Sequence, residues 1–105
     1  MARQTSPEFD AAVKASSQLS EKPSNDDLLA MYALFKQASQ DPPIESAEKV
    51  GMFDLKGKAK RGAWQKIVDE GVTPEEAEQK YIALIEKMKE TYKYDPSKAP
   101  EKVGK

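Results

Sequence analysis

The sequence contains no cysteine and no histidine among its 105 residues. Without cysteine it can form neither a disulfide framework nor a thiolate nucleophile, which fits a reducing compartment. Without histidine it lacks the commonest general base and the commonest zinc ligand. The remaining carboxylates and lysines form no catalytic constellation. We therefore expect a protein that is not an enzyme and has no metal site and no cofactor.

An excess of one charge and a long apolar run are also missing. The 17 basic and 18 acidic residues leave a formal net charge of −1, whereas a nucleic-acid-binding domain is expected to be clearly basic. No segment approaches the roughly 18 apolar residues of a membrane span, and no secretory apolar region follows the N-terminus. We expect a cytoplasmic monomer with no nucleic-acid partner and at most transient membrane contact.

What is present is helical patterning. Apolar residues recur at helical spacing, and β-branched residues do not alternate, so we expect helices and no strands. Ser6, Ser24 and Thr73 are N-cap candidates, and proline follows Ser6 and Thr73 in the first turn. The four expected helices are residues 6 to about 21, 24 to about 39, 56 to about 70 and 73 to about 92.

Four short helices in one small domain predict an all-α, antiparallel bundle. The long connection over residues 41–55 would allow an overhand crossing between the second and third helices. We assign residues 1–92 to the domain. Residues 93–105, rich in lysine and proline, are expected to be a loose C-terminal extension.

Tyr32, Phe35 and Lys36 lie at offsets of three and four, which place them together on one helix. An aromatic ring can stack on a base, and a lysine can pair with a phosphate. The simpler interpretation is an amphipathic helix edge on which the lysine reaches out to solvent. Both interpretations remain open from the spacing alone.

A basic run, KGKAKR, occupies residues 56–61 at an expected helix N-terminus. Cations are unfavourable there because the helix dipole is already positive, unless an anion binds. A solvated basic face or a localisation-like run would look the same. Trp64, four residues after Lys60, is assigned to the core. Tyr81 lies on the apolar stripe of the fourth helix, where a groove edge would give its hydroxyl a partner.

These segments resemble the acyl-CoA-binding protein family, in the same order and at similar spacing over about residues 6–92. The most specific combination is YALFKQAS at residues 32–39 with GMFDLKGKAK at residues 51–60. Shorter matches are Phe9-Asp10, Lys22-Pro23, Ala63-Trp64 and Tyr81-Ile82. The resemblance implies a skewed four-helix bundle with up-down-down-up connectivity. It also implies a non-covalent carrier that buffers and transports medium- to long-chain acyl-CoA in the cytosol.

Family roles carried to this sequence define a nucleotide head site. Tyr32, Lys36 and Lys60 would hold the 3′-phosphate of coenzyme A. Phe35 would stack on adenine, where the family more often has tyrosine. Lys56 would lie near the nucleotide phosphates.

The same resemblance implies a site for the rest of the ligand. Tyr81 would close on the pantetheine and acyl end. Leu28 and Leu29, with Ala12, would line the acyl groove.

The sequence departs from the family pattern at several points. The loop from Gln40 to Gly51 looks longer, Ser17 stands where a lysine is common, and Arg61 stands where an aromatic residue is common. A helical protein-interaction module without a small ligand remains the alternative. An enzyme that uses acyl-CoA is a further one, although no nucleophile with a base is visible.

Overall fold

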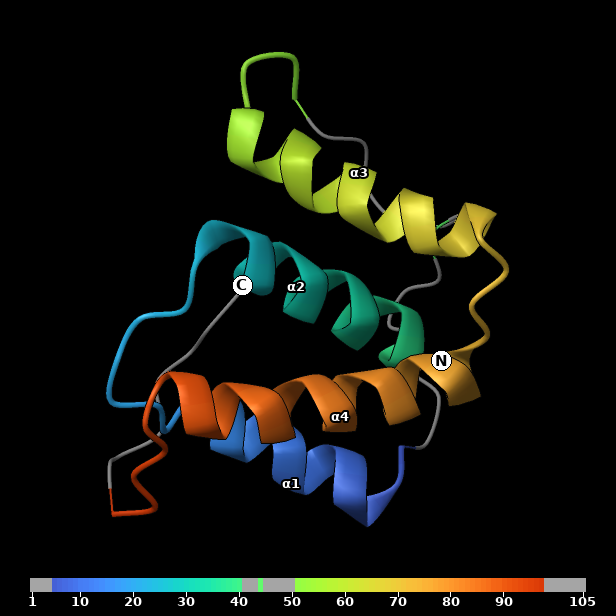
Figure 1. Ribbon diagram of the computed structural model, residues 1–105. Coiled ribbons are helices and arrows are strands. Elements are labelled where there is room, and N and C mark those ends of the chain that lie inside the picture. The colour runs from blue at the N-terminus through green and yellow to red at the C-terminus, as the bar shows by residue number, and fades with distance from the viewer. Residues whose placement is uncertain (1–4, 41–43, 45–50, 98–105) are drawn as a thin grey trace.

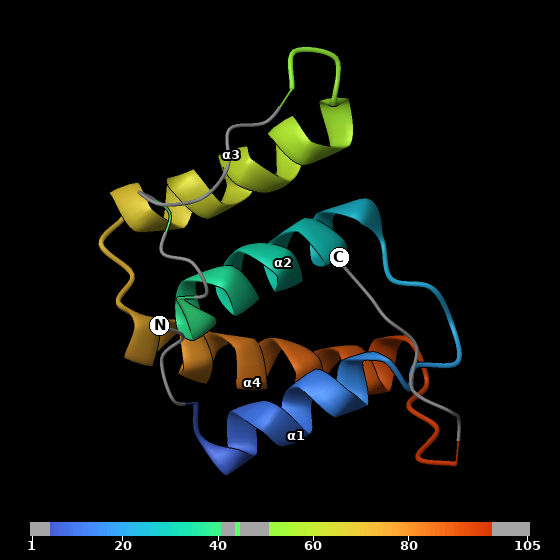
Figure 2. The same ribbon diagram turned by 180° about the vertical axis from the view of Figure 1, so that it is seen from behind.

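The computed structural model describes residues 5–40, 44 and 51–97. Helix α2 packs against both α3 and α4, and α1 packs against α4. Helices α1 and α4 run in one direction, and α2 and α3 run in the opposite direction (Figures 1 and 2). This is the skewed up-down-down-up bundle that we expected. The helices of the described residues are α1 (Pro7–Ser16), α2 (Asn25–Ser39), α3 (Leu55–Asp69) and α4 (Pro74–Thr91).

Each helix begins after a residue whose side chain accepts a backbone N–H three positions further on. The predicted caps at Ser6, Ser24 and Thr73 are confirmed. Asp54 caps α3 in the same way. Because of this cap, which the sequence analysis did not predict, α3 begins at Leu55, slightly before the expected start. Such a cap satisfies one of the N–H groups that the first turn leaves without an intrahelical acceptor.

Helix α1 ends earlier than predicted. The expected helix reached the segment before Pro23, but the structure ends it at Ser16. The hydroxyls of Ser16 and Ser17 donate to the carbonyl oxygens of Val13 and Lys14, at 2.6 and 2.7 Å. Such local hydrogen bonds compete with helix continuation. The chain then leaves the helix axis and places Leu19 in the core.

The start of the C-terminal segment is held to the connection between α1 and α2. Leu19 and Tyr94 form an isolated antiparallel bridge. The N–H groups of Ser20 and Asp95 donate to the carbonyls of Lys93 and Gln18, both at 2.9 Å. We expected a loose extension from Lys93 onward, and for residues 93–97 this is a correction. Residues 98–105 lie outside the described residues.

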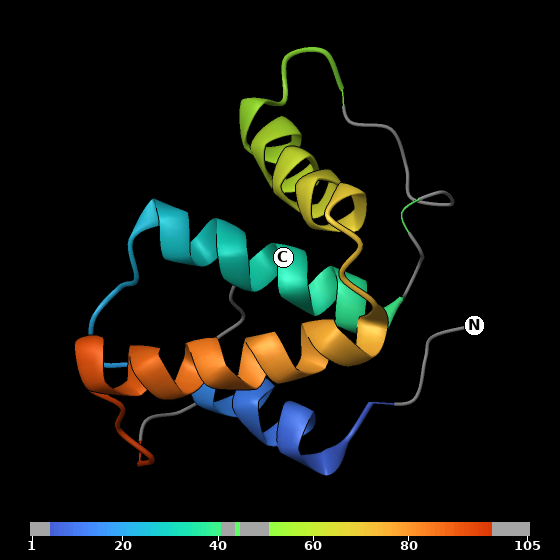
Figure 3. The same cartoon turned by 45° about the vertical axis from the view of Figure 1, so that its right-hand side comes forward.

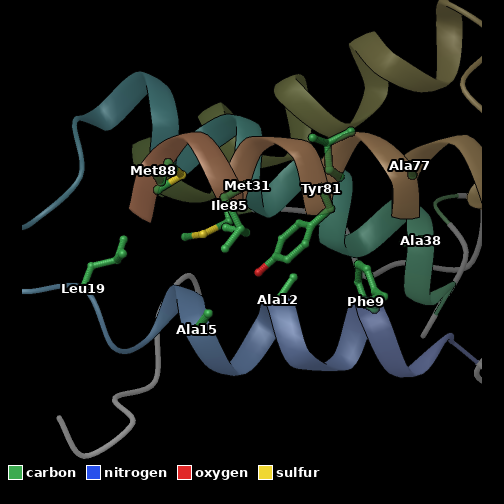
Figure 4. Packing of buried hydrophobic residues seen from close by; sticks show 11 residues of the cluster. Phe9, Ala12, Ala15, Leu19, Met31, Ala38, Ala77, Tyr81, Ile85 and Met88 are labelled. Atoms are coloured by element: carbon green, nitrogen blue, oxygen red, sulfur yellow. The ribbon is translucent and has the colours of Figure 1, made fainter. Parts of the chain in front are cut away.

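The main core lies between α1, α2 and α4 (Figure 4). A smaller cluster between α2 and α3 contains Ala33, Ile44 and Trp64, so the predicted core position of Trp64 is confirmed. The buried residues of the main core are Phe9, Ala12, Ala15, Leu19, Met31, Leu34, Ala38, Ala77, Tyr81, Ile85 and Met88.

Tyr81 lies deep in this core with 2% of its surface exposed, so the groove-edge position that we expected is wrong. Its ring points from α4 toward α1, with the hydroxyl between Ala12 and Ala15 (Figure 4). The side chain of Ser16 is the hydrogen-bond partner of this hydroxyl. Burial raises the pKa of Tyr81 to about 12, and the bond to Ser16 opposes part of that rise.

Replacing Tyr81 with phenylalanine should change how stability depends on pH. The pKa of about 12 in the folded state exceeds the ordinary value of 10.0. The neutral hydroxyl therefore contributes its full stability below pH 10 and loses it as pH rises through the folded-state pKa. Two pKa units correspond to roughly 2–3 kcal/mol. Denaturant titrations from pH 9 to pH 12 should show the wild type losing about that much relative to Tyr81→Phe. A difference that does not vary with pH would contradict this burial.

Candidate anion-binding site

Two lysines from different helices approach the ring of Tyr32. The Nζ atom of Lys36 lies 6.0 Å from the ring centroid, and that of Lys60 lies 5.3 Å from it. Tyr32 and Lys36 are one turn apart on α2. Lys60 comes from α3, which packs against α2. The fold thus brings together two cations that the sequence separates by more than twenty positions, and their role in binding remains a prediction.

Trp64 fixes the contact between α2 and α3 beneath these lysines. Its indole is 2% exposed, and the Nζ atom of Lys36 lies 5.8 Å from its ring centroid. Trp64 Nε1 donates to Gln37 Oε1 at 3.1 Å. Gln37 Nε2 in turn donates to the carbonyl of Val72 at 2.8 Å. Because this chain of hydrogen bonds is largely buried, it holds the two helices at one separation.

Arg61 is a third cation of this cluster. Burial raises the pKa of Tyr32, and the positive charge of Arg61 opposes part of that rise. The Nη2 atom of Arg61 donates to the carbonyl of Ile44 at 3.5 Å. We had noted Arg61 only as a departure from the family pattern. The signal was present in the sequence, because Arg61 directly follows Lys60 in the basic run.

The three cations have no carboxylate partner among the described residues. In that part of the chain the ion pairs are Lys89 with Glu86 and Lys93 with Glu21. Cation–π attraction to the ring of Tyr32 stabilises the lysines by a modest amount. Like charges near one ring still repel each other, and a bound anion would relieve that repulsion. We define this anion site as Tyr32, Lys36, Lys60 and Arg61.

Phe35 faces a different neighbour. Its ring is stacked on that of Phe9 at a centroid distance of 6.0 Å and lies 6.4 Å from that of Tyr81. It therefore packs toward α1 and α4, whereas Lys36 lies toward α3. The ring remains half-buried, so part of it is accessible. Stacking on adenine remains a prediction for that accessible part.

The other expected contact residues are spread over the surface and the core. Lys56 is exposed in the first turn of α3, one turn before Lys60. Leu28 and Leu29 are half-buried near the start of α2. Ala12 is buried in the main core, and its contact with an acyl chain remains a prediction. Any contact of Tyr81 with a ligand would require movement of the α1 side chains that cover it.

The described residues contain no group of three acidic, histidine or cysteine side chains placed to hold a metal ion. None of the helices in the described ranges has both the length and the apolar character of a membrane span.

The family model described as "Acyl CoA binding protein" matches residues 6–85. This match covers all four helices except the end of α4, and the chain belongs to that family.

Individual relatives agree with this assignment. The chain is 44% identical over 80 residues to acyl-CoA-binding protein homolog 1 of Caenorhabditis elegans, covering 76% of this chain and 88% of the relative. It is 40% identical over 80 residues to the acyl-CoA-binding protein of Saccharomyces cerevisiae, covering 76% and 87%. The crystal structure of Oryza sativa acyl-CoA-binding protein 2 matches with a TM-score of 0.68 at 33% identity, over 80% of this chain and 89% of that one.

Inorganic pyrophosphate should stabilise the protein through the anion site. At ten times its dissociation constant, a ligand specific for the folded state adds about 1.4 kcal/mol, or several degrees in melting temperature. The double variant Lys36→Met/Lys60→Met should lose this stabilisation, because methionine keeps the apolar stem and removes the charge. Scanning calorimetry at constant ionic strength measures the effect.

The matched control is Lys80→Met/Lys87→Met, which removes two exposed lysines of α4. This control should keep the full response to pyrophosphate. An equal response in both double variants would show that the cations over Tyr32 do not form an anion site.

Proposed function

We propose that this protein binds medium- to long-chain acyl-CoA thioesters without reacting with them, and buffers and transports them in the cytosol as a monomer. The observation that carries the proposal is the approach of Lys36 and Lys60 to the ring of Tyr32, with no carboxylate partner in the described chain. Family membership supports the choice of ligand, because the relatives are named for binding acyl-CoA.

The head of the ligand is assigned to the anion site. Its 3′-phosphate accepts hydrogen bonds from Lys36 and Lys60, with the Tyr32 hydroxyl beside them, and Arg61 adds positive potential. Lys56, one turn before Lys60, lies toward the remaining phosphates, and the accessible part of Phe35 stacks on adenine. A hydrogen bond to a charged group contributes about 1.5–3 kcal/mol. Several such bonds make the nucleotide the source of specificity.

The acyl tail supplies most of the affinity. Each methylene that leaves water contributes about 0.8 kcal/mol, so a long chain outweighs the head even when only half of it is covered. Leu28 and Leu29 are half-buried on α2 and offer accessible apolar surface for the tail. They lie one turn before Tyr32 on the same helix, so the tail would begin near the head site.

Non-catalytic binding follows from the available side chains. The chain has no cysteine and no histidine, which removes the usual nucleophile and base for attack on a thioester. The anion site offers cations that have no carboxylate partner among the described residues, and these would hold a phosphate without changing it. A bound thioester is therefore expected to leave the site intact.

Titration calorimetry should rank palmitoyl-CoA well above coenzyme A, and both above palmitate. Palmitoyl-CoA should bind more tightly than coenzyme A because it has the acyl tail. Both should bind more tightly than palmitate because palmitate lacks the nucleotide. Palmitoyl-CoA should also raise the melting temperature and should be recovered unhydrolysed after incubation.

Each alternative gives a different result. Equal affinity for palmitate would contradict a nucleotide head site. A protein-interaction module without a small ligand would show no stabilisation by palmitoyl-CoA. Loss of the thioester that depends on the protein would show an enzyme.

A further inference from the structure

The loop before α3 and the first residue of α3 carry three large apolar side chains that are exposed to solvent. Met52 is 74% exposed, Phe53 is 90% exposed and Leu55 is 76% exposed. The one other large hydrophobic residue that is exposed in the described part of the chain is Tyr94, at 36%. The loop projects beyond the N-terminal end of α3, on the side away from α1 and α4 (Figure 3). We call residues 51–58 the α3 tip.

The α3 tip has a defined backbone. The N–H of Asp54 donates to the carbonyl of Gly51 at 3.1 Å, which closes a turn. The carboxylate of Asp54 accepts the N–H of Gly57 at 2.9 Å and caps the helix. These bonds hold the tip in shape while its apolar side chains remain in water. Several large apolar side chains exposed within a few residues of each other are typical of an interaction surface.

The charges around the tip indicate that its partner is anionic. Lys56, Lys58, Lys60 and Arg61 lie in the first two turns of α3, and the first turn contains no acidic residue. The chain as a whole has a net charge of −1, so this end of the molecule is basic while the remainder is acidic. Exposed apolar side chains at the tip, followed along the chain by lysines, suit an anionic bilayer, because its charged headgroups cover an apolar interior.

We propose that the α3 tip docks this protein on anionic lipid bilayers. Phe53, with Met52 and Leu55, enters the boundary between headgroups and acyl chains, and Lys58 remains at the lipid phosphates. The four helices stay above the surface, because the tip projects away from α1 and α4. The contact is reversible, since one small apolar patch with a few lysines binds weakly. It does not depend on acyl-CoA binding, although a ligand with an apolar tail and an anionic head collects at the same interface.

The test is sedimentation of the ligand-free protein with vesicles of phosphatidylcholine, with and without phosphatidylserine. Binding should require phosphatidylserine and should fall as salt is raised. Phe53→Ser and Lys58→Glu should each reduce the partition coefficient at least about fivefold. Lys87→Glu reverses a charge on the exposed face of α4 and is the matched control, which should bind like the wild type.

Two outcomes would overturn the proposal. The first is no sedimentation with phosphatidylserine vesicles, or equal sedimentation of Phe53→Ser and the wild type. The second is a loss of palmitoyl-CoA affinity in Phe53→Ser while vesicle binding is unchanged, which would assign the tip to the acyl tail. Calorimetry with palmitoyl-CoA on the same variants separates these results from a failure of the proposed function.

Discussion

The buried hydrogen bond from the Trp64 indole to Gln37 is the interaction on which the site depends. Only a small apolar cluster lies between α2 and α3, so a bond of defined direction fixes how they pack. Breaking it would leave a buried polar group unsatisfied, at a cost of about 1–3 kcal/mol. Gln37 also binds the carbonyl of Val72, just before α4. The same side chain therefore joins α2, α3 and the chain entering α4, and Lys60 reaches Tyr32 because of it.

That packing brings cations of two helices to one aromatic ring. Lys36 and Lys60 lie over Tyr32, Arg61 follows Lys60 on α3, and the described chain offers them no carboxylate. The main core lies on the other side of α2, where Phe9, Phe35 and Tyr81 contact each other. The main core and the candidate anion site thus lie on two different faces of α2, with Phe35 on the core side. A substitution at the anion site can therefore alter binding while the main core stays packed.

Much of the fold could be predicted because its signals are local. The caps at Ser6, Ser24 and Thr73 depend on residues within one turn, and the apolar spacing of α4 determines its inward face. The path of the chain after α1 could not be predicted, because residues 18–21 pair with residues 92–95, which are far apart from them in the sequence. Spacing placed Phe35 and Lys36 on one helix, but consecutive residues differ by about 100° in direction. The positions of α3 and α4 are needed to see that Phe35 packs toward Tyr81 of α4 while Lys36 lies over Trp64 of α3. Tyr81 illustrates a further limit, since periodicity gives the face of a residue and not its depth.

A double-mutant cycle between protein and ligand measures whether Lys36 binds the 3′-phosphate. Calorimetry would compare palmitoyl-CoA with its analogue lacking the 3′-phosphate, on the wild type and on Lys36→Ala. We expect a coupling free energy of about 1.5–3 kcal/mol, with the variant almost indifferent to removal of the phosphate. Independent, additive losses from the two changes would contradict it.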